Sequence, residues 1–336
     1  MTQSVNAWAA QNPKGPFEPF EYTLGPLGAL DVDIDVASCG ICHSDMSMWH
    51  NEWGMSQFPL VPGHEVTGQV RAVGSEVSHL KPGDWVGVGW HAGYCNTCHE
   101  CLGGDHNLCG SAEGTIVARH GGFADRIRAR APSAVRLPDG IDPMTAGPLL
   151  CGGITVFNPL VQMNVKPTDR VGVIGIGGLG HLALQFASAW GCEVVAFSSN
   201  ADKTAEAKAF GAHHVVNSRD EAALAEWAGQ LDFILSTVNV MLAWDQYLAC
   251  LKPKGQLHVV GAALEPMAVP AFSLIPAQRS VSGSPVGSPV TIATMLEFAA
   301  RHGIAPKVER FEFDQVNEAI DHLASGQARY RVVLAR

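Results

Sequence analysis

The chain has 336 residues, 47% of them hydrophobic and 16% charged, with a formal net charge of −10. That length suits about two domains with separate cores, and the composition excludes wholesale disorder. An acidic balance disfavours nucleic acid as a partner. The uncharged stretches 143–165 and 171–192 are broken by proline, amides or glycine, so we interpret them as buried soluble segments rather than membrane spans.

Up to about residue 140, short strands punctuated by glycine and proline are expected. Residues 29–37 (ALDVDIDVA) and 66–73 (VTGQVRAV) alternate apolar and polar side chains, which is typical of half-exposed strands. KPGDW at 81–85 is a turn signal, and VGVG after it resumes a strand. This half of the chain is predicted to be an all-β barrel or sandwich.

After residue 150 the pattern changes to alternating strands and helices. Strands are predicted at 170–174, 193–197, 231–235 and 256–260, and helices at 177–190 and 202–210. This alternation favours a doubly wound parallel sheet. From about residue 290 a helix at 295–300 and strands at 307–313 and 330–334 are expected to return to the first domain.

A glycine-rich hexapeptide lies between the first strand and the first helix of the second half. It reads Gly175-Ile176-Gly177-Gly178-Leu179-Gly180 and fits G-x-G-x-x-G. Glycines there allow a tight turn and close approach to a pyrophosphate, which the helix N-terminus also attracts. We therefore predict a dinucleotide site, the alternative being a glycine-rich turn without a ligand.

The second strand of this half ends without an acidic residue. NAD sites usually place Asp or Glu there to bind the ribose 2′-hydroxyl, but the chain has Ser198, Ser199 and Asn200, with Lys203 shortly after. Glu193 comes too early and Asp202 after the turn. Hydroxyls, an amide and a lysine suit a 2′-phosphate, so NADP(H) is favoured over NAD(H). The alternative for Lys203 is a solvated helix position.

Four of the nine cysteines crowd into fifteen residues. The first twenty residues lack the basic and apolar segments of a signal peptide, so we expect a cytoplasmic, reducing location and metal rather than disulfides. Four thiolates can close a tetrahedral structural zinc site, whereas the bacterial iron–sulfur run has a shorter last gap. The expected structural ligands are Cys95, Cys98, Cys101 and Cys109.

Several motifs then occur in order: CGICHSD, VPGHEVTGQV, the four-cysteine lobe, GGFAD, PLLCGGITVFNPL and VGVIGIGGLGHLAL. With these motifs the chain resembles the zinc-dependent medium-chain alcohol dehydrogenases, in the branch of cinnamyl alcohol dehydrogenases and bacterial aldehyde reductases. The resemblance implies an α/β protein with a GroES-like β-rich catalytic domain (1–150 and 290–336, with a zinc lobe at 95–109) and a Rossmann domain that binds NADP (151–289).

The resemblance also implies roles for dispersed residues that spacing alone does not connect. It makes Cys42, His64 and Cys151 the ligands of a catalytic zinc, which gives two zinc ions per chain, and Glu65 a transient ligand. It implies that Asp45 orients His64, that His43 lies near the pyrophosphate, and that Ser44 binds the reacting oxygen. Ser198, Ser199 and Lys203 fall where the NADP-using branch holds the 2′-phosphate.

One position departs from the family pattern. Many members have a histidine two residues after the aspartate of CHSD, where it passes protons to water, and this chain has Ser47 there. Ser47 could hold a water, or His50 could reach in. The expected substrate pocket is apolar and aromatic, with four candidate lining residues: Trp49, Trp53, Trp90 and His91.

The predicted activity is the interconversion of a primary alcohol and an aldehyde, aromatic or medium-chain aliphatic, with NADP(H). An NAD-dependent zinc alcohol dehydrogenase is the closest alternative, and a non-catalytic cofactor-binding protein is the alternative from another class. The expected partner is the small-molecule substrate, without nucleic acid or membrane. From the resemblance a homodimer or homotetramer is expected.

Overall fold

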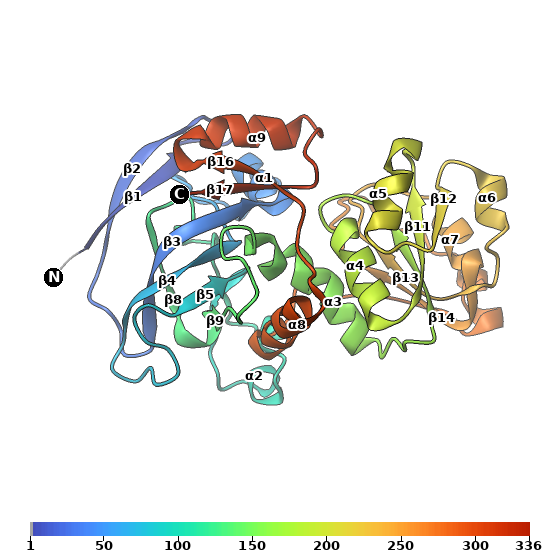
Figure 1. The fold of residues 1–336 in the computed structure, drawn as a ribbon, viewed down its shortest axis with the longest axis horizontal. Helices are drawn as coiled ribbons and strands as arrows, with labels where there is room; N and C mark the ends of the chain where they lie inside the picture. The colour runs from blue at the N-terminus through green and yellow to red at the C-terminus, as the bar shows by residue number, and fades with distance from the viewer. Residues whose placement is uncertain (1–2) are drawn as a thin grey trace. The chain divides into compact units, whose positions relative to one another are not determined.

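The structure is a computed structural model that describes residues 3–336. It divides into two compact units, shown in Figure 1: unit 1 is Met1–Ile154 with Gly287–Arg336, and unit 2 is Thr155–Val286. The sequence predicts these boundaries at 150/151 and 289/290, a few residues away. No helix in the described residues has both the length and the apolar character needed to cross a bilayer.

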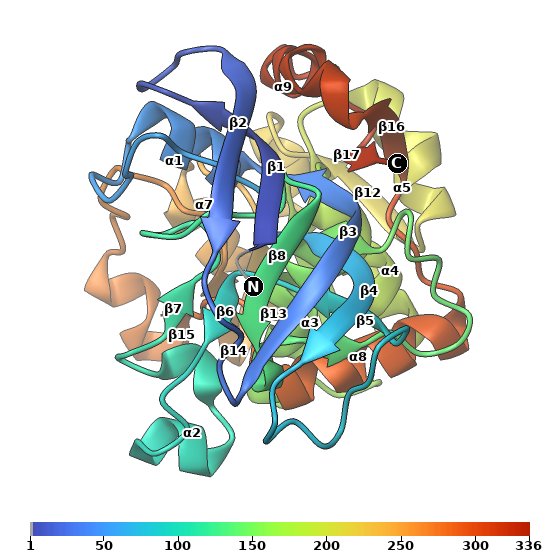
Figure 2. The same cartoon turned by 90° about the vertical axis from the view of Figure 1, so that its left-hand side faces the viewer.

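Unit 1 is built on a seven-stranded sheet in which β3 is the central strand. The order is β16-β17-β3-β4-β5-β9, and β8 pairs with β3 as well; Figure 2 shows β3 crossing the unit between β4 and β8. The strands are β3 (Asp31–Ile41), β4 (Val66–Val73), β5 (Trp85–Val88), β8 (Arg126–Arg130), β9 (Val135–Arg136), β16 (Val308–Glu312) and β17 (Arg331–Ala335).

In the described part of unit 1, two smaller pairs of strands and four α-helices accompany this sheet. The hairpin β1 (Gln3–Ala10) and β2 (Phe17–Leu24) and the pair β6 (His91–Gly93) and β7 (Glu113–Gly114) form two-stranded sheets. The helices are α1 (His43–His50), α2 (His99–Gly103), α8 (Pro289–His302) and α9 (Val316–Ala324), and α9 packs on β17 (Figure 1). A further helix, α3 (Gly152–Gln162), starts in unit 1 and continues into unit 2.

The alternation in β3 separates a core face from a charged face. Val32, Ile34 and Val36 are buried in the main apolar cluster of unit 1. Three aspartates alternate with these apolar residues along β3. Each lies opposite an arginine of β8: Asp31 opposite Arg130, Asp33 opposite Arg128, and Asp35 opposite Arg126. Opposite charges directly across a strand pair attract each other, so this ladder favours the observed register over a slipped one.

We expect Asp33→Ala to destabilise unit 1 more than any other change in this ladder. The Asp33 carboxylate is fully buried and accepts two bonds from Arg128, at 2.7 and 3.1 Å. Removing it leaves the guanidinium of Arg128, which is only 13% exposed, without its opposite charge. This should lower the free energy of unfolding by about 2–4 kcal/mol. Asp35→Ala, at a 46% exposed carboxylate in the same strand, should cost below about 1 kcal/mol. Urea unfolding measures both, and equal losses would contradict the argument.

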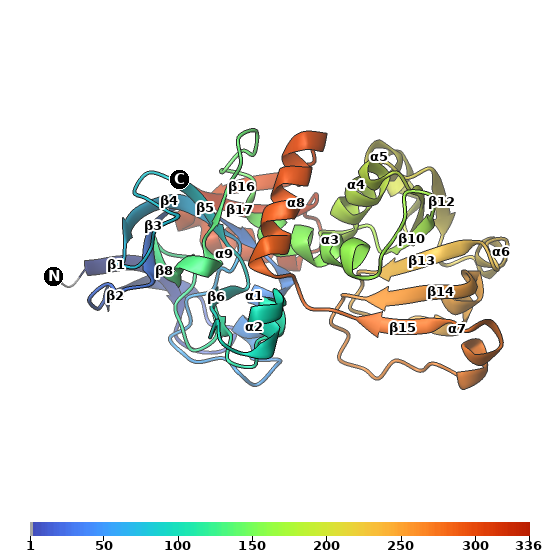
Figure 3. The ribbon, with the colours of Figure 1, turned by 90° about the horizontal axis from the view of Figure 1, so that it is seen from below.

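Unit 2 is a six-stranded parallel sheet in the described residues. Its order is β12-β11-β10-β13-β14-β15, and in Figure 3 β13, β14 and β15 have their arrowheads at the same edge. The strands are β10 (Arg170–Ile174), β11 (Glu193–Ser198), β12 (His214–Asn217), β13 (Leu231–Ser236), β14 (Leu251–Val259) and β15 (Ser280–Gly283). The helices are α4 (Gly180–Trp190), α5 (Thr204–Ala209), α6 (Glu221–Ala225) and α7 (Trp244–Cys250).

This strand order confirms the predicted doubly wound fold. The chain reverses its direction across the sheet between β10 and β13, and in doubly wound sheets ligands bind outside the carboxyl ends of the strands at such a reversal. The glycine-rich segment 175–180 directly follows β10 and therefore lies at that edge. Short apolar strands such as RVGVI are buried on both faces, as expected for a parallel sheet covered by helices.

Candidate active site and metal centres

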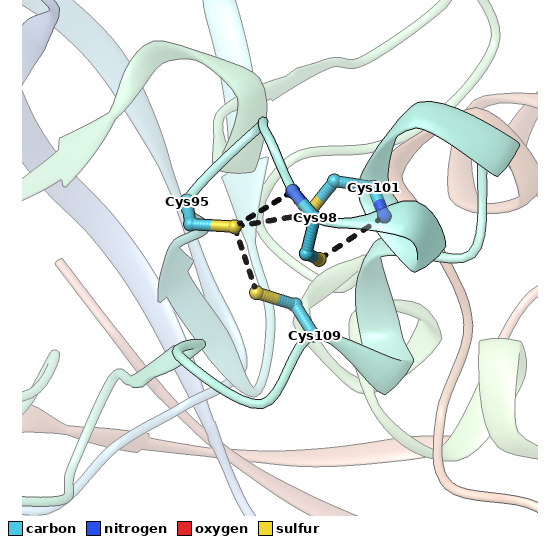
Figure 4. Close-up of side chains that lie close together, drawn as sticks. All are labelled: Cys95, Cys98, Cys101 and Cys109. Carbon is cyan, nitrogen blue, oxygen red and sulfur yellow. Dashed lines mark hydrogen bonds between the residues drawn. The ribbon is translucent and has the colours of Figure 1, made fainter.

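The four cysteines of the lobe in unit 1 come together in one cluster (Figure 4). Cys98 is the N-cap of the short helix α2, and its sulfur accepts from Cys101 N, so this turn brings the sulfurs inward. Cys95 Sγ lies 3.6 Å from Cys109 Sγ and 3.9 Å from Cys101 Sγ. Two sulfurs bound to a tetrahedral zinc at ~2.3 Å lie about 3.8 Å apart, so these spacings fit such an ion.

The backbone of the lobe favours the ionised form of its first thiol. The N–H groups of Thr97 and Cys98 donate to Cys95 Sγ at 3.5 and 3.3 Å. These bonds lower the pKa of Cys95 to about 6, so this sulfur is a thiolate at neutral pH. A thiolate is the form that binds a metal. All nine cysteines of the chain are free thiols, which agrees with metal ligation rather than disulfide formation in the lobe.

A second cluster joins residues that are far apart in the chain. Cys42, His64, Glu65 and Cys151 are all buried, and their candidate ligand atoms lie within 4.8 Å of one another. Cys42 follows β3, His64 and Glu65 precede β4, and Cys151 precedes α3, so the sheet and the helix start position the set. Cys42 Sγ and Cys151 Sγ are 4.0 Å apart, close to the spacing expected on zinc.

Asp45 fixes the orientation of the histidine in this cluster. The aspartate is fully buried and accepts from Cys42 N at 2.9 Å, Gly63 N at 2.8 Å and His64 Nδ1 at 2.9 Å. In the neutral imidazole, a proton on Nδ1 that is donated to Asp45 leaves the lone pair of Nε2 for a metal. His64 Nε2 is buried and has no hydrogen-bond partner among the described residues. An unpaired buried nitrogen aimed at two thiols fits a metal ligand.

Glu65 is paired with a buried arginine that sequence reasoning missed. Arg331 Nη2 donates to Glu65 Oε1, and both side chains are almost completely buried. Burial raises the pKa of Glu65 to about 7, although the charge of Arg331 acts in the opposite direction. In the antiparallel pair of β17 and β3, Val332 lies opposite Ile41. Arg331, one residue earlier, therefore lies beside Cys42, one residue later. The sequence does contain a signal for this ion pair: an arginine lies inside the apolar run YRVVL, and a buried arginine needs a partner.

The proposed substrate residues differ in their surroundings. The Trp90 ring lies 5.0 Å from the His64 ring, and Trp53 lies 6.0 Å from Trp90. Trp49 packs on Phe17 and donates to the carbonyl of Gly15 at 2.8 Å. His91 contacts Tyr94, and burial lowers the pKa of His91 to about 4, so it is neutral. The structure thus links only two of these four residues to the metal cluster by ring contacts among the described residues.

The glycine-rich segment has the geometry that its motif predicts. Gly175 has a φ of +87°, a conformation that favours glycine. A Cβ on Gly180 would lie 1.8 Å from the Gly175 carbonyl oxygen, whereas one on Gly177 would meet nothing within 4 Å. No side chain caps the amino end of α4, which begins at Gly180 rather than at the predicted residue 177. A helix N-terminus without a side-chain cap suits a phosphate group.

Polar residues follow β11 at the same edge of unit 2. Ser198 Oγ donates to the Asn200 carbonyl at 3.0 Å, and Ser199 and Asn200 are exposed. Lys203, in the short helical turn Ala201–Lys203, donates to the Ile176 carbonyl at 2.9 Å, so its ammonium lies against the glycine-rich segment. Glu193 is at the opposite end of β11 and binds Arg170 and His214, which removes it as a ribose ligand.

The fold and these sites define a class: an oxidoreductase with two clusters of candidate metal ligands and a Rossmann domain. Two family models match the chain, "Alcohol dehydrogenase GroES-like domain" over 28–139 and "Zinc-binding dehydrogenase" over 178–301. Aldehyde reductase AdhA of Synechocystis sp. is 59% identical over 331 residues, which cover 98% of each chain.

Solved structures agree with these matches. A cinnamyl alcohol dehydrogenase of Sorghum bicolor superimposes with a TM-score of 0.95 at 38% identity, over 99% of this chain and 98% of the other. The CAD of Helicobacter pylori, solved with NADP(H), has a TM-score of 0.92 at 30% identity, over 100% and 99%. The chain therefore belongs to the family of zinc-dependent medium-chain alcohol dehydrogenases, and the resemblance stated from its motifs is confirmed.

Proposed function

We propose that this protein interconverts primary alcohols and aldehydes with NADP(H), using a zinc ion held by Cys42, His64 and Cys151. The observation that carries this proposal is the buried set of two thiols and one unpaired imidazole nitrogen. Three protein ligands leave a coordination position open, as a catalytic zinc site requires. A second zinc, held by the four lobe cysteines, has a structural role because that set leaves no open position.

The chain's own residues orient and bind around this centre. Zinc bound there would supply Lewis-acid polarisation of the substrate oxygen, and NADPH would supply the hydride. Asp45 holds the His64 ring with Nε2 directed at the thiols. Ser44 Oγ lies 3.9 Å from Cys42 Sγ, where its hydroxyl can bond an oxygen placed beside that sulfur. Glu65, neutralised by Arg331, is placed to act as an alternative ligand.

The aromatic side chains next to His64 favour apolar aldehydes. Trp53 and Trp90 present indole rings on the side of the imidazole, and both pack against the apolar side chains of Met48, Leu60 and Ile116. Such surfaces take aromatic or medium-chain aliphatic groups better than polyols. This preference agrees with the names of the relatives, an aldehyde reductase and cinnamyl alcohol dehydrogenases.

A panel of aldehydes assayed with NADPH and with NADH, beside metal analysis, tests the proposal. We expect two zinc per chain and turnover of cinnamaldehyde or hexanal that is faster with NADPH. Oxidation of neither cofactor across the panel by the zinc-loaded protein would favour a non-catalytic cofactor-binding role. Higher kcat/KM with NADH would support the NAD-dependent alternative.

We expect Lys203→Ala to weaken the binding of NADPH much more than the binding of NADH. The ammonium lies beside the glycine-rich segment, and a charged hydrogen bond to phosphate contributes about 1.5–3 kcal/mol. The KM for NADPH should therefore rise about 10- to 100-fold, while the KM for NADH changes little. Lys208→Ala, in the following helix, is the matched control. Equal effects on both cofactors would assign Lys203 a purely structural role.

A further inference from the structure

A buried histidine near the end of β14 joins that strand to the segment that follows β15. His258 Nδ1 lies 2.8 Å from the hydroxyl of Ser282, its register partner on β15, and Nε2 lies 2.9 Å from the hydroxyl of Ser284. His258 is fully buried. Since β15 ends at Gly283, the Ser282 bond stays within the sheet, whereas the Ser284 bond holds a residue beyond the strand end.

The His258 ring is neutral and can bind both serines at once. Burial lowers the pKa of His258 to about 4, and its ring lies 6.2 Å from the ring of Phe233 in β13. One nitrogen of a neutral imidazole donates a hydrogen bond and the other accepts one, and a serine hydroxyl can do either. In both tautomers, therefore, each ring nitrogen has a serine partner, as buried polar groups require.

The segment after β15 is also held at its far end. The side-chain amide of Asn158, on α3, donates to the Val286 carbonyl at 2.9 Å, and Asn158 is 3% exposed. Val286 is the last residue of unit 2. Side chains from β14 and α3 thus hold both ends of segment 284–286, and satisfied buried networks of this kind make a structure rigid.

The strand order indicates which half of a dinucleotide would meet segment 284–286. The glycine-rich segment follows β10, and the residues proposed for the 2′-phosphate, Ser198 and Lys203, lie at and after the end of β11. A dinucleotide lies across the carboxyl ends of such a sheet, with one mononucleotide on each half. With the adenosine half on the side of β11, the nicotinamide half belongs on the side of β13, β14 and β15, whose carboxyl ends share one edge (Figure 3).

We propose that His258 is a positioning residue for the nicotinamide half of NADP(H), and that it acts by holding Ser284. The inference rests on the proposed function, because it needs a nicotinamide cofactor at this edge of unit 2. Hydride transfer is sensitive to placement, and a misplacement of about 1 Å costs about 100-fold in rate. Loss of the Ser284 bond should therefore impair the binding and reaction of the nicotinamide half and leave the binding of the adenosine half unchanged.

Two substitutions of His258 separate its two hydrogen bonds. The side-chain amide of asparagine lies where Nδ1 lies, so His258→Asn can keep the bond to Ser282 but does not reach Ser284. The amide of glutamine extends to the position of Nε2, so His258→Gln can keep the bond to Ser284.

The binding probes are NADPH and adenosine 2′,5′-bisphosphate, which carries the 2′-phosphate but no nicotinamide. We expect His258→Asn to raise the Kd for NADPH about 3- to 10-fold, the effect of one lost hydrogen bond, and to leave the Kd for the bisphosphate unchanged. In single-turnover reduction of cinnamaldehyde by the zinc-loaded enzyme, the same variant should oxidise NADPH about 10- to 100-fold more slowly. His258→Gln should stay within about twofold of the wild type in all three measurements.

Ser284→Ala removes the other partner of the bond and should cause the same selective loss, so the test does not depend on how well His258→Asn folds. His214→Gln, at the amino end of β12, is the matched control and should behave as the wild type. Equal weakening of NADPH and the bisphosphate by His258→Asn or Ser284→Ala, or no weakening of NADPH by either, would overturn the inference and leave the proposed function standing. A loss in His258→Gln as large as that in His258→Asn would do the same. A wild-type protein that binds neither probe would overturn the proposed use of NADP(H).

Discussion

Replacement of His64 by alanine is expected to reduce kcat/KM at least about 1,000-fold while the protein still folds. The substitution removes the unpaired Nε2 that faces the two thiols. Lewis-acid stabilisation contributes several kcal/mol to the barrier, and about 4 kcal/mol corresponds to this factor. Asp45 keeps two backbone N–H partners, so its buried charge remains satisfied.

Metal analysis and steady-state kinetics measure this effect together. The zinc content should fall from two to one per chain, and the circular dichroism spectrum should match the wild type. His79→Ala, at an exposed histidine of the same unit, is the control and should retain both zinc and turnover. Near-normal turnover of His64→Ala would show that this cluster does not carry the chemistry.

Replacement of Cys109 by serine is expected to affect mainly stability, whereas His64→Ala affects mainly turnover. It should also remove one zinc, but it should lower stability rather than the turnover of the folded protein. The lobe has little apolar support apart from Tyr94, Cys101 and Cys109 themselves, so its order depends on the metal. We expect a loss of at least about 3 kcal/mol, roughly 10 °C in the melting temperature.

Calorimetry and assays well below the melting temperature separate the two effects. Cys192→Ser is the matched control, because Cys192 lies outside both clusters and a serine can keep its bond to the Lys166 carbonyl. That variant should hold two zinc per chain. If Cys109→Ser instead abolished turnover at low temperature while its melting temperature stayed unchanged, the lobe would be part of the active site.

The elements with strong local patterns were predictable, and those set by packing were not. The strand at 170–174 and the strand at 66–73 have the predicted bounds, since their apolar patterns and turn signals are local. Helix α1 was not predicted, because HSDMSMWH has no clear apolar periodicity. Helix α3 was not predicted either: it contains Pro159 and is stabilised by burial, not by intrinsic propensity.

By itself the sequence determined the groups whose members are close along the chain. The four lobe cysteines, the glycine-rich turn and the residues after β11 could be interpreted from spacing, because a few intervening residues limit how far apart such groups can lie. Only the tertiary structure decided which distant residues meet. Cys42 and Cys151 are 109 positions apart and Glu65 and Arg331 are 266 apart, and strand pairing around β3, which no local pattern encodes, brings them to one buried point.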